Sequence, residues 1–155
     1  MSAAAALTLK RADVLGGANV GLELWKASVE QMIFYSSETW MGVMKKTLKI
    51  LDNLYNCFFR CLFRIGTGAS IPNFFIQTGM LNPQNLILMR KLNFYHHLAN
   101  LSPNSLGNQV FKLQSENPSL PSLAKDIDEH LNKLGIADPT SVSKYAWKER
   151  IHDYV

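Results

Sequence analysis

The chain has 155 residues, of which 47% are apolar and 18% charged, and its formal net charge is +4. This length and composition exclude an intrinsically disordered, collagen-like or low-complexity chain and fit one folded domain. The charge is uneven, because residues 41–91 carry seven lysines and arginines and one acid, Asp52. Such a local excess is typical of a surface that binds phosphate groups or an acidic protein, and also of a merely solvated face.

Two helices are predicted in the first half of the chain. An apolar stripe starts at Leu22 and predicts a helix that ends near Tyr35; its members are Leu22, Trp25, Val29, Met32 and Ile33. Apolar residues then recur every three or four positions and predict a helix over residues 43–65. The opposite face of this second helix carries Lys46, Lys49, Asn53, Asn56, Arg60 and Arg64. We therefore expect it to bury an aromatic side and expose a basic one.

Four further helical segments are expected after the Gly66–Gly68 break. The first follows a loop in which residues 71–76 are expected to include a short extended piece. The predicted ranges are about 83–100, begun by Asn82-Pro83; 104–116; a stripe from Leu120 to Leu134, capped by Ser119 or Ser122 and stopped by Gly135; and 140–153, capped by Thr140 or Ser141.

No segment alternates polar and apolar residues as a strand does. The predicted fold is mainly α, a bundle of about six short helices with irregular loops and no significant sheet. Residues 1–18 remain uninterpreted, and residues 19–155 are expected to form a single helical domain.

The sequence contains no recognisable catalytic or metal-binding motif. Its cysteines and histidines lack the spacing of a zinc site, and no nucleophile elbow occurs, so we expect no enzyme activity, metal, cofactor or small-molecule substrate. Cys57 and Cys61 lie four residues apart, where a disulfide has poor geometry, which indicates a reduced, intracellular chain. The cluster of Asp126, Asp128 and Glu129 is interpreted as a solvated face. We expect no signal peptide and no membrane helix, because the uncharged run 65–89 contains several glycines, prolines and asparagines.

Residues 33–40 carry a more specific signal. Their sequence, Ile-Phe-Tyr-Ser-Ser-Glu-Thr-Trp, resembles the Leu-Leu-Tyr-Gly-x-Glu-Thr-Trp segment that follows the palm in many non-LTR (LINE-type) retrotransposon reverse transcriptases. The matching positions are Tyr35, Glu38, Thr39 and Trp40, while the usual glycine is Ser36 and a frequent proline is Gln31. The resemblance extends over about residues 20–150, and Gly66 and Gly68 look like the family's break after the next helix.

The resemblance implies the thumb and post-thumb region of such an enzyme, whose role is to grip the template-primer duplex. The catalytic palm is missing from the printed sequence, which has no adjacent Asp-Asp pair, so the chain is not expected to polymerise DNA. We expect sequence-independent binding to the backbone of RNA or of an RNA–DNA duplex, in the nucleus or cytoplasm. The principal expected contacts are Lys46, Lys49, Arg60 and Arg64, with Lys45, Arg90 and Lys91 as weaker candidates.

Two alternatives to duplex binding remain open at this stage. The chain is alternatively a helical protein-interaction module whose basic face binds an acidic partner. It is otherwise a retroelement relic that retains an ancestral core without a selected function.

Overall fold

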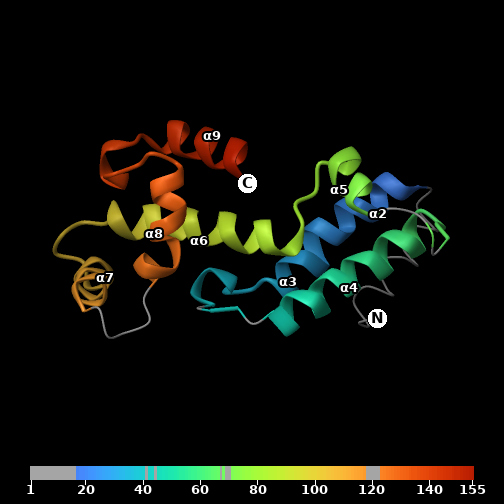
Figure 1. Cartoon of the computed structure of the whole chain (residues 1–155), viewed down its shortest axis with the longest axis horizontal. Coiled ribbons are helices and arrows are strands. Elements are labelled where there is room, and N and C mark those ends of the chain that lie inside the picture. Colours follow the sequence, from blue (N-terminus) through green and yellow to red (C-terminus); the bar gives the residue numbers. More distant parts are fainter. Residues whose placement is uncertain (1–16, 41, 44, 67, 69–70, 118–122) are drawn as a thin grey trace. The chain divides into compact units, whose positions relative to one another are not determined.

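The computed structural model describes residues 17–155 except 41, 44, 67, 69–70 and 118–122. These described residues are mostly helical and contain no strand, which confirms the predicted mainly α class (Figure 1). The elements are α2 (Ala18–Leu24), the π-helix η1 (Trp25–Glu30), α3 (Gln31–Ile33), the 3₁₀ turn η2 (Ser37–Thr39), α4 (Lys45–Leu62), α5 (Pro72–Thr78), α6 (Pro83–Ala99), α7 (Leu106–Glu116), α8 (Leu123–Lys133), the 3₁₀ turn η3 (Pro139–Ser141) and α9 (Lys144–Tyr154).

The described residues fall into two compact units. Within the described ranges, the first unit takes residues 17–35 and residues 45–83, and the second takes residues 36–43 and residues 84–155. The segment between α3 and α4 therefore belongs to the second unit, although both helices belong to the first. Most of the uninterpreted N-terminal segment, residues 1–16, lies outside the described residues.

The first unit is built on an aromatic cluster between the α2–η1–α3 run and α4. Trp25 and Tyr55 are fully buried, and the Trp25 ring stacks on Phe58 with a centroid separation of 3.9 Å. The hydroxyl of Tyr55 donates a hydrogen bond to Glu30 Oε2 at 3.0 Å. The buried side of α4 is the one that the apolar spacing predicted, since its buried residues are Leu51, Tyr55, Phe58 and Phe59.

The π-helix η1 changes which residues of the first helix are buried. A π turn inserts about one extra residue into the helical repeat, so the side chains after it rotate relative to those before it. Trp25 and Val29 are buried as predicted, but Met32, expected in the same stripe, is 68% exposed. Phe34 is fully buried in its place.

Helix α5 replaces the loop and extended piece expected over residues 71–76. Pro72 starts it with a preset helical φ, and Gly79 ends it in the left-handed conformation at φ 62°. Its aromatic residues complete the cluster, because the Phe75 ring lies 5.0 Å from Phe59 and the Phe74 ring lies 5.4 Å from Phe63. The local sequence of α5 marks only its two ends, and tertiary packing of its aromatic residues stabilises the helix between them.

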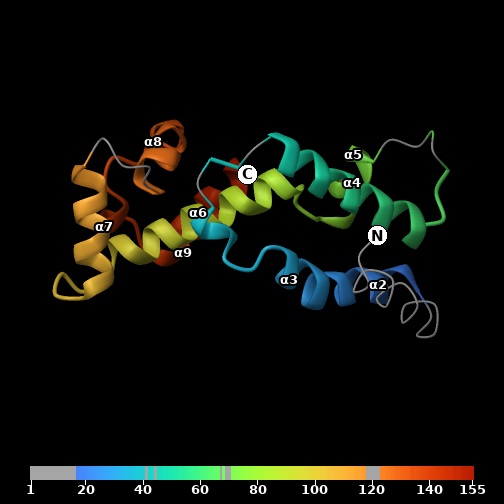
Figure 2. The same ribbon diagram turned by 90° about the horizontal axis from the view of Figure 1, so that it is seen from below.

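Helix α6 is the centre of the second unit, and α7, α8 and α9 all pack against it (Figures 1 and 2). Tyr95 meets Phe111 of α7 edge-on, and His96 stacks on Trp147 of α9 with ring centroids 4.5 Å apart. The buried core of this unit is Leu92, Leu123, Ile127, Leu131, Ile136, Trp147 and Ile151. This agrees with the near-continuous apolar character of the predicted helix 83–100.

The last helices start and stop close to the predicted positions, with one change of cap. Ser143, and neither Thr140 nor Ser141, caps α9 by accepting a hydrogen bond from the Ala146 N–H. Thr140 and Ser141, the predicted caps, belong instead to the short 3₁₀ turn η3, whose N-cap is Asp138. Gly135 follows α8 with φ 66°, as expected of its stop, while Ser119 and Ser122 lie outside the described residues.

Candidate nucleic-acid interface

Helix α4 presents its basic side to solvent because its other side is buried in the aromatic cluster. Residues 46, 49, 53, 56 and 60 follow one another at spacings of three and four, so they share one helix face. Lys46, Lys49 and Asn53 on this face are exposed, and Asn56 and Arg60 are partly exposed. Leu51 and Phe58 on the opposite side are buried. The amphipathic arrangement predicted for this helix is therefore present.

Positive charge is concentrated at the beginning of α4. Lys45, Lys46 and Lys49 lie within about 6 Å of helix rise, and all three are exposed. Among the described residues no carboxylate forms an ion pair with any of them. The first turn holds no acidic residue, and the helix dipole places partial positive charge at the same end. Each lysine there costs the isolated helix about 0.3–1 kcal/mol, whereas a bound anion would be favoured.

The other end of α4 uses its arginines differently. Arg60 Nη1 donates a hydrogen bond to the carbonyl of Gly66, and the Ile65 N–H donates to the Arg60 carbonyl at 3.0 Å. Arg64 follows the helix with φ 53°, so α4 ends at Leu62 and not at the predicted residue 65. Arg60 thus helps to fold the chain back after the helix.

Gly66 and Gly68 are both exposed, and a Cβ added at either would meet no atom within 4 Å. Gly66 does not adopt a positive φ. Close packing therefore does not require glycine at these two positions, which were predicted to match the break after this helix in the reverse transcriptase family.

Arg90 and Lys91 belong to the second unit, so the seven predicted basic contacts do not form one cluster within a unit. Lys91 is buried, and its Nζ lies 2.6 Å from Asp126 Oδ2 on α8. The same carboxylate oxygen accepts a hydrogen bond from the Gly42 N–H at 3.4 Å. This ion pair assigns Lys91 a structural role. Asp126, Asp128 and Glu129 are all exposed, as the interpretation of a solvated face expects, and Asp126 in addition pairs with Lys91. Arg90 is partly buried.

The segment that resembles the reverse transcriptases contains the change from one unit to the other. Tyr35 is the last residue of the first unit and is 79% exposed. Ser36 adopts a left-handed conformation with φ 55°, which glycine adopts without strain. The Thr39 hydroxyl donates to the Ser36 carbonyl at 2.8 Å and closes the turn η2. Glu38 and Trp40 are partly exposed.

The histidines have structural partners or lie in solvent. His96 is held against Trp147, with Nε2 3.1 Å from the Val142 carbonyl oxygen, whereas its neighbour His97 is exposed. His130 Nδ1 lies 2.8 Å from the Tyr154 hydroxyl. Partial burial, and secondarily the charge of Lys133, lower the pKa of His130. No group of three histidine, cysteine or acidic side chains in the described part of the chain is arranged to hold a metal ion.

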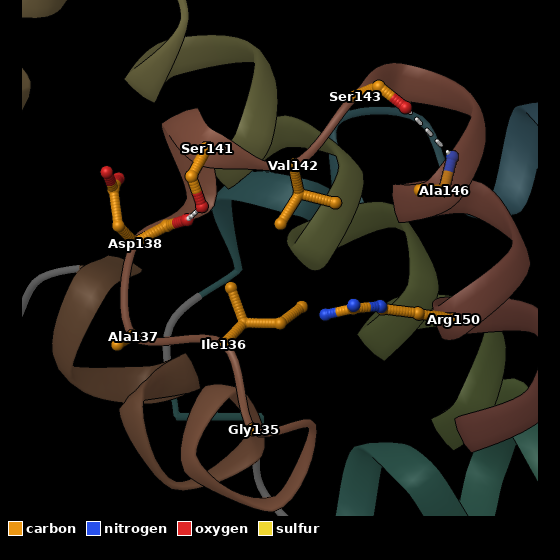
Figure 3. Close-up of a pocket in the computed structure, with 9 residues that line it drawn as sticks. All are labelled: Gly135, Ile136, Ala137, Asp138, Ser141, Val142, Ser143, Ala146 and Arg150. Atoms are coloured by element: carbon orange, nitrogen blue, oxygen red, sulfur yellow. Dashed lines mark hydrogen bonds between the residues drawn. The ribbon is translucent and has the colours of Figure 1, made fainter.

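A pocket of about 620 Å³ lies where α8 leads into α9, and no sequence pattern marked it. Figure 3 shows the Arg150 side chain extending toward Ile136 and Val142, which form its apolar side. The two serines of the lining are already engaged: Ser141 Oγ donates to the Asp138 carbonyl, and Ser143 Oγ accepts from the Ala146 N–H. Hydrogen bonds from the Thr140 side chain and backbone lower the pKa of the Asp138 carboxyl. The lining residues thus pair no nucleophile with a general base.

None of the helices in the described ranges combines the length and the apolar character needed to cross a membrane. The chain matches no protein-family model, no curated protein and no solved structure. The function must therefore be argued from the residues themselves.

Proposed function

We propose that the chain binds the phosphate backbone of a nucleic-acid duplex, without sequence preference, through the exposed basic face of α4. The observation that carries this proposal is the group of Lys45, Lys46 and Lys49 at the positive end of the helix, which are exposed and have no carboxylate partner in the part of the chain that the structure describes. Lysine ammonium groups bind phosphates as point charges, which supports affinity without base recognition. Catalysis is not part of the proposal.

The resemblance to the thumb region of non-LTR reverse transcriptases supports the same function. In that family the segment after the palm grips the template-primer duplex, which makes an RNA–DNA hybrid the preferred ligand for a test. The left-handed Ser36 fits the resemblance, because it occupies the position where the family usually has glycine. Arg60 and Arg64 are assigned a secondary part, since Arg60 also supports the chain reversal after α4.

The salt dependence of duplex binding tests this assignment. Each phosphate contact contributes about −0.9 to the slope of log affinity against log salt, so three lysines correspond to a slope of about −2.7. The double substitution Lys46→Glu and Lys49→Glu should make the slope shallower by about 1.8. Fluorescence anisotropy with a labelled RNA–DNA hybrid, measured over a series of salt concentrations, gives both values.

A matched control carries the same change in net charge elsewhere. Lys144→Glu with Lys148→Glu reverses two exposed lysines of α9 in the second unit and should leave the slope unchanged. Equal effects of the two double variants would show that only overall charge matters. An unchanged slope in the α4 variant would refute the proposed interface.

An acidic protein is the second candidate partner, and one observation favours it. Ile50 is 59% exposed and follows Lys49 directly, so the lysines flank an apolar side chain of a kind that protein interfaces bury. Absence of duplex binding at low salt, in a protein that melts cooperatively, would favour this partner. A non-cooperative melt would instead fit a relic without a selected function.

A further inference from the structure

Cys57 and Cys61 form a pair of neighbouring thiols on α4. They lie one helical turn apart, Cys57 partly exposed and Cys61 exposed, and neither is in a disulfide. The four-residue spacing places both side chains on the same face of α4, one turn apart. The pair borders the basic face, because Cys57 lies one helical turn from Asn53 and from Arg60, but the two thiols are not among the groups proposed to bind the duplex.

The spacing of this pair disfavours a direct disulfide. Side chains four residues apart on a helix have Cβ atoms about 5–6 Å apart, whereas a disulfide requires about 3.5–4.5 Å. A single atom that bonds to both sulfurs lengthens the bridge and removes this mismatch. The helix can then stay intact while the two sulfurs are joined.

The number of ligands restricts which centre can bridge the thiols. Structural zinc takes four protein ligands, and catalytic zinc usually takes three. Within the described ranges no third histidine, cysteine or acidic side chain joins the pair. Soft sulfur ligands favour soft centres, and among these a trivalent arsenical with one organic substituent needs only two thiolates. Its third position is filled by its own carbon.

The surroundings of the pair also suit an organic substituent. Ile50 and Leu54 continue the line of Cys57 and Cys61 toward the start of α4, at spacings of four, three and four residues. Ile50 is 59% exposed and Leu54 is partly exposed, so this flank offers apolar surface to an aryl group. Partial desolvation of the sulfur, and secondarily the Cys57 thiol, raise the pKa of Cys61.

We propose that Cys57 and Cys61 form a dithiol site that captures monosubstituted trivalent arsenicals as a cyclic dithioarsenite. In the reaction an arylarsonous acid, ArAs(OH)₂, loses both hydroxyl groups. Two As–O bonds break and two As–S bonds form, and each hydroxyl leaves as water with one thiol proton. Arsenic remains trivalent throughout, so the reaction needs no oxidant or reductant.

Phenylarsonous acid, the hydrate of phenylarsine oxide, is the probe for the test. Intact-protein mass spectrometry should show one phenylarsenic group per chain and the loss of two thiol protons. The adduct should resist an excess of a monothiol and dissociate with a small dithiol. Cys57→Ser and Cys61→Ser should each weaken retention against the monothiol by about 100-fold or more, because the second bond is intramolecular.

Two further variants keep two thiols in the chain and change only their geometry. Asp52→Cys in a Cys61→Ser background places the sulfurs on different sides of α4 and should behave like a single-cysteine variant. Asn53→Cys in the same background restores a four-residue spacing to Cys57 and should restore retention. Circular dichroism of each variant verifies that the helix is formed.

The dithiol assignment would be overturned if the unaltered protein bound two arsenicals per chain. Retention in the single-serine variants equal to that of the unaltered protein would also overturn it. The same holds if the Asp52→Cys variant retained the probe as well as the Asn53→Cys variant. Because the assay contains no nucleic acid, its outcome is independent of the duplex-binding test.

Discussion

The ion pair between Lys91 and Asp126 predicts an unequal response to removing either partner. The Lys91 side chain is 9% exposed and the Asp126 side chain 32%, and the two charged atoms lie 2.6 Å apart. Asp126→Asn leaves the ammonium nearly buried without a counter-charge. Lys91→Met removes the buried charge, fills similar volume, and leaves a carboxylate that water can reach. The aspartate substitution should therefore cost more.

The magnitude follows from how deeply the pair is buried. Breaking a fully buried pair costs about 3–5 kcal/mol, while exposed pairs contribute about 0–1 kcal/mol. Since Asp126 is about one-third exposed, we expect Asp126→Asn to lower the free energy of unfolding by about 2 kcal/mol. Lys91→Met should lower it by less than about 1 kcal/mol. The double variant should be close to Lys91→Met alone, because the carboxylate then has no buried charge to neutralise.

The change in unfolding free energy of the second unit is measured by urea unfolding, with hydrogen exchange of peptides from α6 and α8 as the readout. Exchange in α4 peptides serves as the internal reference, because α4 belongs to the first unit. Raising the salt concentration should change the result little, since ions screen a buried pair poorly. Equal losses for the two single variants, or a loss below about 0.5 kcal/mol for Asp126→Asn, would refute the reasoning.

Two further predictions concern the backbone and a histidine. Ser36→Gly should stabilise the chain by about 0.5–1 kcal/mol in thermal or urea unfolding, because glycine relieves the left-handed strain at φ 55°. Ser36→Ala keeps this strain and is the control. A destabilised Ser36→Gly variant would contradict the prediction. The lowered pKa of His130 means that the unfolded chain binds the proton more readily. Its stabilising contribution is therefore present above the unfolded pKa of about 6.5 and is lost as the pH falls through the folded value. His130→Gln should flatten the fall in unfolding free energy between about pH 7 and about pH 5, and an unchanged slope would exclude this cause.

The long amphipathic helices were predictable because their burial follows from local spacing. In α4 the threes and fours of Leu51, Tyr55 and Phe58 mark one buried side whatever the rest of the chain does. The predicted range 83–100 likewise agrees with α6, since its first-turn proline and its apolar run are both local signals. Helix α5 was missed because its stability comes from Phe74 and Phe75, whose aromatic partners lie elsewhere in the chain.

The candidate site was predictable only in part, for a related reason. The helical phase of residues 43–65 correctly predicted that Lys46 and Lys49 are exposed, and the charge count over residues 41–91 added the other basic candidates. The same count included Lys91, whose partner Asp126 is 35 residues away on another helix and carries no local mark. The π turn in η1 also has no simple signature, so the exposure of Met32 could not be read from the helical period. Residue spacing in the sequence predicts which side of a helix is buried, but it does not predict which residues of distant elements pair with each other.

The assignment of Ser36–Val43 to the second unit has a consequence for how the chain can be divided. The polypeptide passes from the first unit to the second after Tyr35, returns before α4, and passes over again near Pro83. No single cut therefore separates the two units into complete pieces. A fragment that begins at Gln84 would leave Asp126 without its hydrogen bond from the Gly42 N–H. A fragment that ends at Pro83 would contain Ser36–Val43 without the rest of the second unit, to which this segment belongs. The segment Ser36–Val43 precedes α4 in the chain but belongs to the second unit. During synthesis, Gly42 can therefore form its hydrogen bond to Asp126 only after α8 has been made.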